Sequence, residues 1–242
     1  MARLFPLALF ALLANICQAD ILTKSATRSV TALTTGGPRL SDSTTTFGSY
    51  SKSLTSVGVS DAGTVTAAAK QTSSIPDPLG QSIAGVGEVA ASVDATGRTG
   101  YSVVADSFFE VFFEVDLDGV YSFDASIEFD SDFPPFGGFV KVELLDVTHS
   151  LTLESVSLDA INQGTDSILK SVALFAGTEY SLFARVRIDG GAALAGPFGG
   201  SSTWDASIQQ IPEPSSALLL VSAATCCTIA TGRFKVRRWI FR

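Results

Sequence analysis

Two neighbouring stretches, FEVFFEVDL at residues 109–117 and YSFDASIEF at residues 121–129, decide the fold class. In both, an apolar side chain occupies every second position and mostly polar side chains lie between. A period of two is typical of β-strands with one buried face. Asp118-Gly119 separates the stretches, and pairing Leu117 with Tyr121 would keep the apolar faces together. We therefore expect a hairpin closed by a three- or five-residue loop.

The same alternation recurs later in the chain, at 140–144, 180–188 and 204–208. Its phase shifts between Leu153 and Val156, which predicts a β-bulge, and residues 168–175 form a more continuous apolar run. Residues 20–100 are rich in Ser, Thr, Ala and Gly, so we expect short, poorly marked strands and long loops there. Gly-rich turns and the lack of a helical period complete the pattern. It predicts an all-β fold, an antiparallel β-sandwich of jelly-roll type over residues 20–210, with about eight to eleven strands.

Charge and composition narrow the classes of function. The 242 residues carry a formal net charge of −8. Residues 20–211 contain 23 of the 24 acidic residues but only 10 of the 16 basic ones, which gives this segment a net charge of −13. Such a surface repels nucleic acid and anionic lipid. One His and three Cys argue against a transition-metal site, and we expect no cofactor.

The chain begins as a secretory signal peptide does. Met1-Ala2-Arg3 is basic, residues 4–16 are nearly all apolar, and Cys17 and Ala19 are small residues that suit the last positions before a cleavage site. We expect cleavage after Ala19, because the apolar stretch is short for a membrane span; an uncleaved anchor is the alternative. Cys17 then leaves with the signal peptide, and the exported segment 20–211 contains no cysteine and forms no disulfide.

The other end of the chain has three parts. Pro212-Glu213-Pro214 is followed by an uncharged stretch at 215–232 and a basic tail at 233–242, whose charges are carried by Arg233, Lys235, Arg237, Arg238 and Arg242. As a transmembrane helix, residues 215–232 would span roughly 27 Å, just enough for a thin bilayer. The positive-inside rule then keeps the tail in the cytoplasm and everything before Pro212 outside the inner membrane.

This end resembles the PEP-CTERM sorting domain, over residues 211 to about 238. The module is also labelled the ice-binding protein C-terminal domain, which implies nothing about ice here. The resemblance implies that a membrane-embedded protease, exosortase, recognises Pro212, Glu213 and Pro214. It also implies an inner-membrane intermediate, a final location at the cell surface or in the extracellular matrix, and a host that makes exopolysaccharide. The chain departs from the pattern at Cys226-Cys227 and in its last four residues, 239–242.

Acidic residues are the candidates for a metal site. Asp116-x-Asp118-Gly119 resembles the opening of a calcium loop, but the third acid and the distal Glu of such a loop are missing. Glu128, Asp130 and Asp132 follow near the end of the next predicted strand. A solvated acidic face with an Asp-Gly turn is the plainer interpretation of these five residues, and no metal site is assigned.

Three further candidates concern catalysis and sugar binding. We interpret His149 as part of a surface turn, because no Gly-x-Ser-x-Gly motif accompanies it. Asp124 and Glu128 would lie about 13 Å apart on a strand, too far for either glycosidase mechanism. The aromatic side chains that fall on the polar faces of their strands could form a sugar-stacking platform, although a neighbouring loop or strand often covers such rings; they are Phe108, Phe112 and Phe183.

We therefore expect a non-enzymatic exported surface or extracellular-matrix protein. The alternative is a polysaccharide- or calcium-binding module of the exopolysaccharide matrix, and a secreted hydrolase is the third hypothesis. A sugar-binding module would show a row of aromatic side chains on one sheet face. A hydrolase would show converging acids, or His149 within reach of a Ser and an acid, in a cleft.

Overall fold

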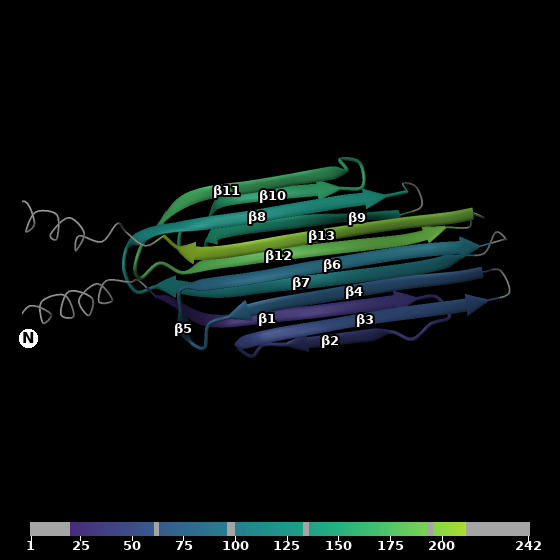
Figure 1. Ribbon diagram of the computed structural model, residues 1–242, viewed down its shortest axis with the longest axis horizontal. Helices are drawn as coiled ribbons and strands as arrows, with labels where there is room; N and C mark the ends of the chain where they lie inside the picture. Colours follow the sequence, from purple (N-terminus) through teal and green to yellow (C-terminus); the bar gives the residue numbers. More distant parts are fainter. Residues whose placement is uncertain (1–19, 61–62, 96–99, 133–135, 193–195, 212–242) are drawn as a thin grey trace, which may run out of the picture. The chain divides into compact units, whose positions relative to one another are not determined.

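The computed structural model describes residues 20–60, 63–95, 100–132, 136–192 and 196–211, and all of its regular structure is β (Figure 1). Within these ranges the strands are β1 (Ile21–Thr34), β2 (Leu40–Thr44), β3 (Gly48–Ser60), β4 (Gly63–Ile75), β5 (Leu79–Gly80), β6 (Ser82–Ala95), β7 (Tyr101–Val115), β8 (Gly119–Ser131), β9 (Phe136–Asp146), β10 (Leu151–Asp159), β11 (Gly164–Leu174), β12 (Tyr180–Ala192) and β13 (Gly196–Gln210). The predicted signal peptide and the sorting segment from Pro212 onward lie outside the described residues.

The strands form two antiparallel sheets that pack face to face. Sheet A has the order β10-β9-β12-β7-β1-β2, with the short β5 also paired to β1, and sheet B has the order β11-β8-β13-β6-β4-β3. Figure 1 looks through both layers, with β12 behind β13 and β7 behind β6. The predicted all-β fold and antiparallel two-sheet sandwich are therefore confirmed, with thirteen strands in the described residues instead of eight to eleven.

The core between the sheets is filled by the alternating side chains that the sequence pattern singled out. On β7 and β8 every inward side chain from Phe109 to Val115 and from Tyr121 to Phe129 is at most 2% exposed. Aromatic rings pair across the core, with ring centroids 5.5 Å apart for Phe109–Trp204. Because aromatic side chains bury large areas, this part of the core carries much of the hydrophobic stabilisation.

Trp204 on β13 lies against two glycines of β6. Gly85 and Gly87 face inward, and Trp204 is the registered neighbour of Gly87 across the strand pair. A Cβ built on Gly87 would lie only 2.1 Å from the indole Nε1. The indole thus occupies the space that side chains at 85 and 87 would fill, a recurrent way to pack glycine within a sheet.

A buried arginine joins the two sheets near the β2 and β3 edges. Arg28 on β1 is fully buried, and its guanidinium donates to the carbonyl oxygens of Thr46 and Gly48, the latter at 2.9 Å. The ring of Tyr50 lies 5.2 Å from the guanidinium carbon. Burial lowers the pKa of Arg28 and raises that of Tyr50 to about 12. The arginine therefore holds the β2–β3 connection to the body of the sandwich.

The expectation of short strands and long loops over residues 20–100 is wrong. Strands β1, β3, β4 and β6 are 13 or 14 residues long. Their inward positions hold small or polar side chains, such as Ala67, Ala69 and Gln71 on β4. Because such side chains give little hydrophobic contrast between the two faces, the period of two is faint in the sequence.

The predicted hairpin across Asp118-Gly119 is also wrong. Strand β7 belongs to sheet A and β8 to sheet B, so the chain crosses between the layers and Leu117 does not pair with Tyr121. Leu117 is instead 50% exposed. Alternation shows which face of a strand is buried but not which sheet the strand joins, and here two successive strands with matching patterns lie in opposite sheets.

The bulge predicted between Leu153 and Val156 is confirmed at the first of these residues. The register of β10 against β9 shifts between Thr152 and Glu154. Val156 beyond the shift is buried, whereas Leu151 before it is 56% exposed. A fully buried side chain on β10 thus appears only after the bulge.

Candidate functional site

Four phenylalanines lie on the outer face of sheet A, on its adjacent strands β9, β12 and β7. They are Phe139 on β9, Phe183 on β12, and Phe108 and Phe112 on β7, and we call this surface the aromatic face. Each is half-buried, although the neighbouring residues along the strand point into the core. The prediction that Phe108, Phe112 and Phe183 lie on the outward faces of their strands is confirmed. Phe139 was missed, although the alternation at 140–144 places it outward by the same rule.

Arg185 organises the middle of the aromatic face. Its guanidinium carbon lies 5.9 Å from the ring centroid of Phe108 and 5.7 Å from that of Phe139. Nε and Nη2 donate to the two carboxylate oxygens of Asp106, at 3.2 and 2.6 Å, which raises the pKa of Arg185. Phe108 also meets Phe183 edge to face at 5.7 Å. The rings and the ion pair thus hold one another in fixed positions.

A hollow of about 370 Å³ opens at one end of the aromatic face, beside the turn that joins β9 to β10. We call it the β9–β10 hollow. Three residues that are cross-strand neighbours on β9, β12 and β7 line it: Leu145, Ser181 and Phe112. Glu110, two residues before Phe112 on β7, adds a carboxylate. The turn side completes the lining with Asp146, Val147, Ser150, Leu151 and Thr152. The volume falls at the low end of the range for small-ligand pockets.

Two polar side chains in this lining, Ser181 and Glu110, are more buried than outward-facing polar side chains usually are. Ser181 faces outward from sheet A yet is only 1% exposed, and its hydroxyl has no hydrogen-bond partner among the described residues. Glu110 is half-buried, and burial raises the pKa of its carboxyl group. The sequence marked neither residue, because the hollow arises only when β7, β9 and β12 pair.

His149 lies in the β9–β10 turn, with its side chain 65% exposed. Its Nδ1 lies 2.8 Å from Oδ2 of Asp146, and its backbone N–H donates to Oδ1 of that carboxylate at 2.9 Å. Burial alone would raise the pKa of Asp146, but these hydrogen bonds outweigh it and lower the pKa. No serine hydroxyl among the described residues hydrogen-bonds to His149, so the structure shows an Asp–His pair that closes the turn.

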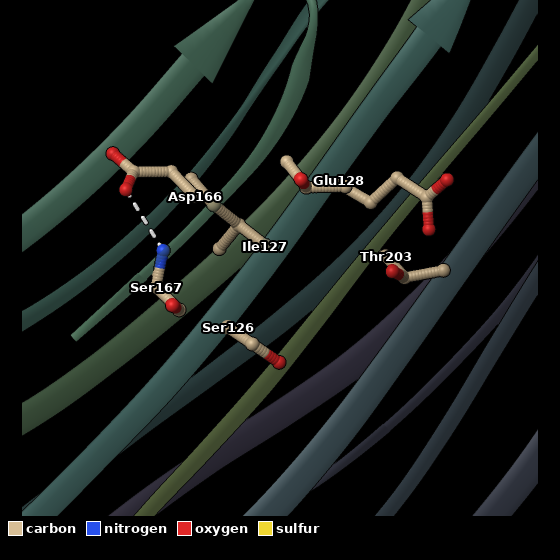
Figure 2. Close-up of a pocket in the computed structure, with 7 residues that line it drawn as sticks. Ser126, Ile127, Glu128, Asp166, Ser167 and Thr203 are labelled. Atoms are coloured by element: carbon tan, nitrogen blue, oxygen red, sulfur yellow. Dashed lines mark hydrogen bonds between the residues drawn. The ribbon is translucent and has the colours of Figure 1, made fainter. Parts of the chain in front are cut away.

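A second hollow, of about 410 Å³, lies on the outer face of sheet B over β8, β11 and β13. Its polar lining comes from Ser126, Glu128, Thr165, Asp166, Ser167 and Thr203. Figure 2 shows the carboxylates of Glu128 and Asp166 on opposite sides, with Asp166 accepting the N–H of Ser167 at 2.8 Å. The two acids therefore do not converge on one point.

The five candidate calcium residues fall into two separate groups. Asp116 and Asp118 lie between β7 and the start of β8, where each uses one carboxylate oxygen to accept a backbone N–H, from Asp20 and Ala176 respectively. Glu128, Asp130 and Asp132 lie near the far end of this 13-residue strand, roughly 40 Å away. In the part of the chain that the structure describes, no three acidic, histidine or cysteine side chains are grouped so that they could hold a metal ion.

The sorting motif Pro212, Glu213 and Pro214 and the basic residues of the tail lie outside the described residues. In the ranges that are described, no helix is long and apolar enough to cross a membrane.

Comparison with known proteins gives no family for the chain. No protein-family model and no curated protein matches it. Among solved structures it is similar to the arabinose-bound α-L-arabinofuranosidase MgGH51, with 16% identity and a TM-score of 0.19, over 67% of this chain and 22% of that one. It is also similar to a VP2 subviral particle of infectious bursal disease virus (8% identity, TM-score 0.15, 81% of this chain and 64% of that one) and to the Gt strain of that virus (10%, 0.16, 81% and 79%). The chain thus spans less than a quarter of the arabinofuranosidase, and at such TM-scores these likenesses carry no argument about function.

Proposed function

We propose that the protein is a non-enzymatic surface or extracellular-matrix protein, exported through its N-terminal signal and sorted by a C-terminal signal of the PEP-CTERM type. The order of segments at the end of the chain carries this proposal. Strand β13 ends at Gln210, and Pro212-Glu213-Pro214 follows at once, before the uncharged stretch and the basic tail. In this scheme an exosortase-type protease acts on the motif, and the sandwich passes from the inner membrane to the cell surface or the matrix.

The test compares three forms of the protein in its host: the full chain, a deletion of residues 212–242, and a Pro212→Ala/Pro214→Ala variant that keeps the apolar stretch and the tail. We expect the full chain to be processed and to reach the surface. The deletion should be released in soluble form, and the double variant should remain unprocessed in the inner membrane. The proposal fails if the deletion stays with the envelope as the full chain does.

We also infer that the eight strands β6–β13 form a jelly roll. The order β6-β13-β8-β11 in sheet B and β7-β12-β9-β10 in sheet A supports this, since successive strands pass from one sheet to the other at nearly every connection. In this arrangement β4-β3 and β1-β2 extend the two sheets beyond β6 and β7.

Binding of polysaccharide is a second candidate function, favoured by the aromatic face. Half-buried rings held by Arg185 present fixed apolar surfaces of the kind that pack on sugar rings, and the β9–β10 hollow adjoins them. We expect the full chain in detergent to bind the host's exopolysaccharide in affinity electrophoresis, and Phe183→Ala to weaken that binding. Phe175→Ala is the control, since it removes a 56% exposed phenylalanine outside this face. Equal effects of the two substitutions would rule the aromatic face out.

A further inference from the structure

Glu110, on the outer face of sheet A, has no counter-ion among the described residues. The neighbouring charged side chains on β1, β7, β9 and β12 pair at short range, in Lys24–Glu114 (3.0 Å), Lys141–Glu143 (2.5 Å), Arg185–Asp106 (2.6 Å) and Arg187–Asp189 (3.0 Å). Glu110 lies among these pairs on β7, yet it has no ion-pair or hydrogen-bond partner among the described residues, and burial alone acts on its carboxyl group. A half-buried charge without a partner destabilises the fold, because water is partly removed and nothing replaces it.

The immediate surroundings of Glu110 suit a ligand that is both cationic and amphipathic. Phe112 gives the β9–β10 hollow an aromatic surface two residues further along the same strand. Across the strand pair, Ser181 is only 1% exposed, and its buried hydroxyl has no partner in the described structure. A carboxylate and an unpaired hydroxyl beside an aromatic ring are complementary to an ammonium group, a hydroxyl group and an apolar ring face.

We propose that the β9–β10 hollow binds a sugar unit that carries a free primary ammonium group, such as a glucosamine unit within a polysaccharide. Glu110 accepts hydrogen bonds from the ammonium group, Phe112 packs on the apolar face of the sugar ring, and the Ser181 hydroxyl pairs with a sugar hydroxyl. This inference rests on the polysaccharide-binding function proposed above and names the class of sugar that the site selects.

A cationic sugar fits this site better than a neutral one for two reasons. A neutral sugar would remove water from Glu110 without providing a charge in return, so binding would carry the full cost of desolvating the carboxylate. The exported segment has a net charge of −13, which attracts a cationic polymer at long range and repels an anionic one.

The experiment measures binding of the full chain in detergent by calorimetry in 0.15 M salt, about the strength at which distant charges are screened. The probes are a β-1,4-linked glucosamine hexamer, its fully N-acetylated counterpart and a hexalysine peptide. The hexamers share ring and linkage and differ in the ammonium group, and hexalysine carries the charge without the sugar. Glu110→Gln is the test variant. Glu114→Gln is its matched control, because it removes the same charge from the same face of β7, outside the hollow.

We expect the glucosamine hexamer to bind wild type and Glu114→Gln alike and to bind Glu110→Gln about tenfold more weakly or worse, the effect of losing one hydrogen bond to a charged group. Glu110→Gln should also raise the thermal unfolding midpoint at pH 7.5, because it removes the unpaired charge. Ser181→Ala should weaken hexamer binding by a smaller factor. A substitution that weakens binding while it stabilises the fold identifies a binding residue. Replacing a residue with a purely structural role would destabilise the fold instead.

Several outcomes would overturn the inference. Equal losses in Glu110→Gln and Glu114→Gln would show that general charge attraction explains the binding, and tighter binding of hexalysine would point to a peptide. If the acetylated hexamer binds as well as the free amine, the amino-sugar preference is wrong although sugar binding stands. If neither hexamer binds while the host's exopolysaccharide still does, the assignment to this hollow fails but the polysaccharide function survives. Loss of every sugar interaction would remove both.

Discussion

Replacing Gly87 by alanine would test how Trp204 is packed against β6. The added Cβ would lie 2.1 Å from Nε1 and 2.4 Å from Cε2 of the indole, and 2.6 Å from Oγ of Ser107. Non-bonded carbon atoms normally approach to about 3.5–4.0 Å. Trp204 is fully buried and packs on Phe109, so the ring cannot move away without displacing its neighbours.

Overpacking of a core usually costs about 1–3 kcal/mol, and a deep overlap with an enclosed ring belongs at the upper end, about 3 kcal/mol. For a domain of this size each kcal/mol lowers the unfolding midpoint by about 2–4 °C, so we expect Gly87→Ala to unfold roughly 6–12 °C below wild type. Fluorescence of the 20–211 segment can follow the transition in heat or urea, because Trp204 is the only tryptophan in that segment.

Two further variants make this prediction specific. Gly199→Ala serves as the control, since its added Cβ would lie 3.9 Å from the nearest atom, the carbonyl oxygen of Ala91, an ordinary contact. Trp204→Phe should cost less in the Gly87→Ala background than alone, because the smaller ring relieves the overlap. The packing argument is refuted if Gly87→Ala changes the free energy of unfolding by less than about 0.5 kcal/mol, the usual range for neutral substitutions. Strict additivity of the two substitutions would refute it equally.

Three other predictions use the same segment. Gln71→Leu should raise the free energy of unfolding by about 1–3 kcal/mol, and with it the urea midpoint, because Gln71 is fully buried and neither amide atom has a partner in the described structure. A lower midpoint would show that its polar atoms are satisfied. Arg28→Met should speed limited proteolysis between β2 and β3, because two carbonyl oxygens there lose their donor, and an unchanged cleavage pattern would contradict that role. Titration with millimolar Ca²⁺ should give no binding heat in wild type or in Asp116→Asn/Asp118→Asn, because one oxygen of each carboxylate already accepts a backbone N–H; heat that the double variant abolishes would restore the calcium hypothesis.

The parts of the fold that sequence predicted well are those with large alternating side chains. Inward positions such as Phe123 and Val142 contrast strongly with their polar neighbours, and the structure buries them completely. Around Gly85 and Gly87 the contrast vanishes, because the bulk that fills the core there comes from Trp204, more than a hundred residues later. Local periodicity cannot record a partner that arrives from so far along the chain.

The candidate site shows the same limit. The outward phase of Phe108 and Phe183 was readable from each strand separately. The roles of Glu110 and Ser181 depend on what lies beside them, and β7, β9 and β12 become neighbours only through the strand order. A polar residue between apolar ones is normally an exposed one. Nothing in the sequence distinguishes the outward serine that becomes covered or the outward glutamate that has no cation.

The position of β13 has a mechanical consequence. This last strand ends at Gln210 and is hydrogen-bonded along its length to β6 on one side and to β8 on the other. A pull on the C-terminal end, of the kind that a tethered surface protein would experience in flowing water, acts along β13. It must slide that strand past two neighbours at once, since β13 has no free edge from which the ladders could open one bond at a time. Tension applied to that end would thus be shared across the middle of sheet B, and the domain should hold its fold under loads that would peel away an edge strand.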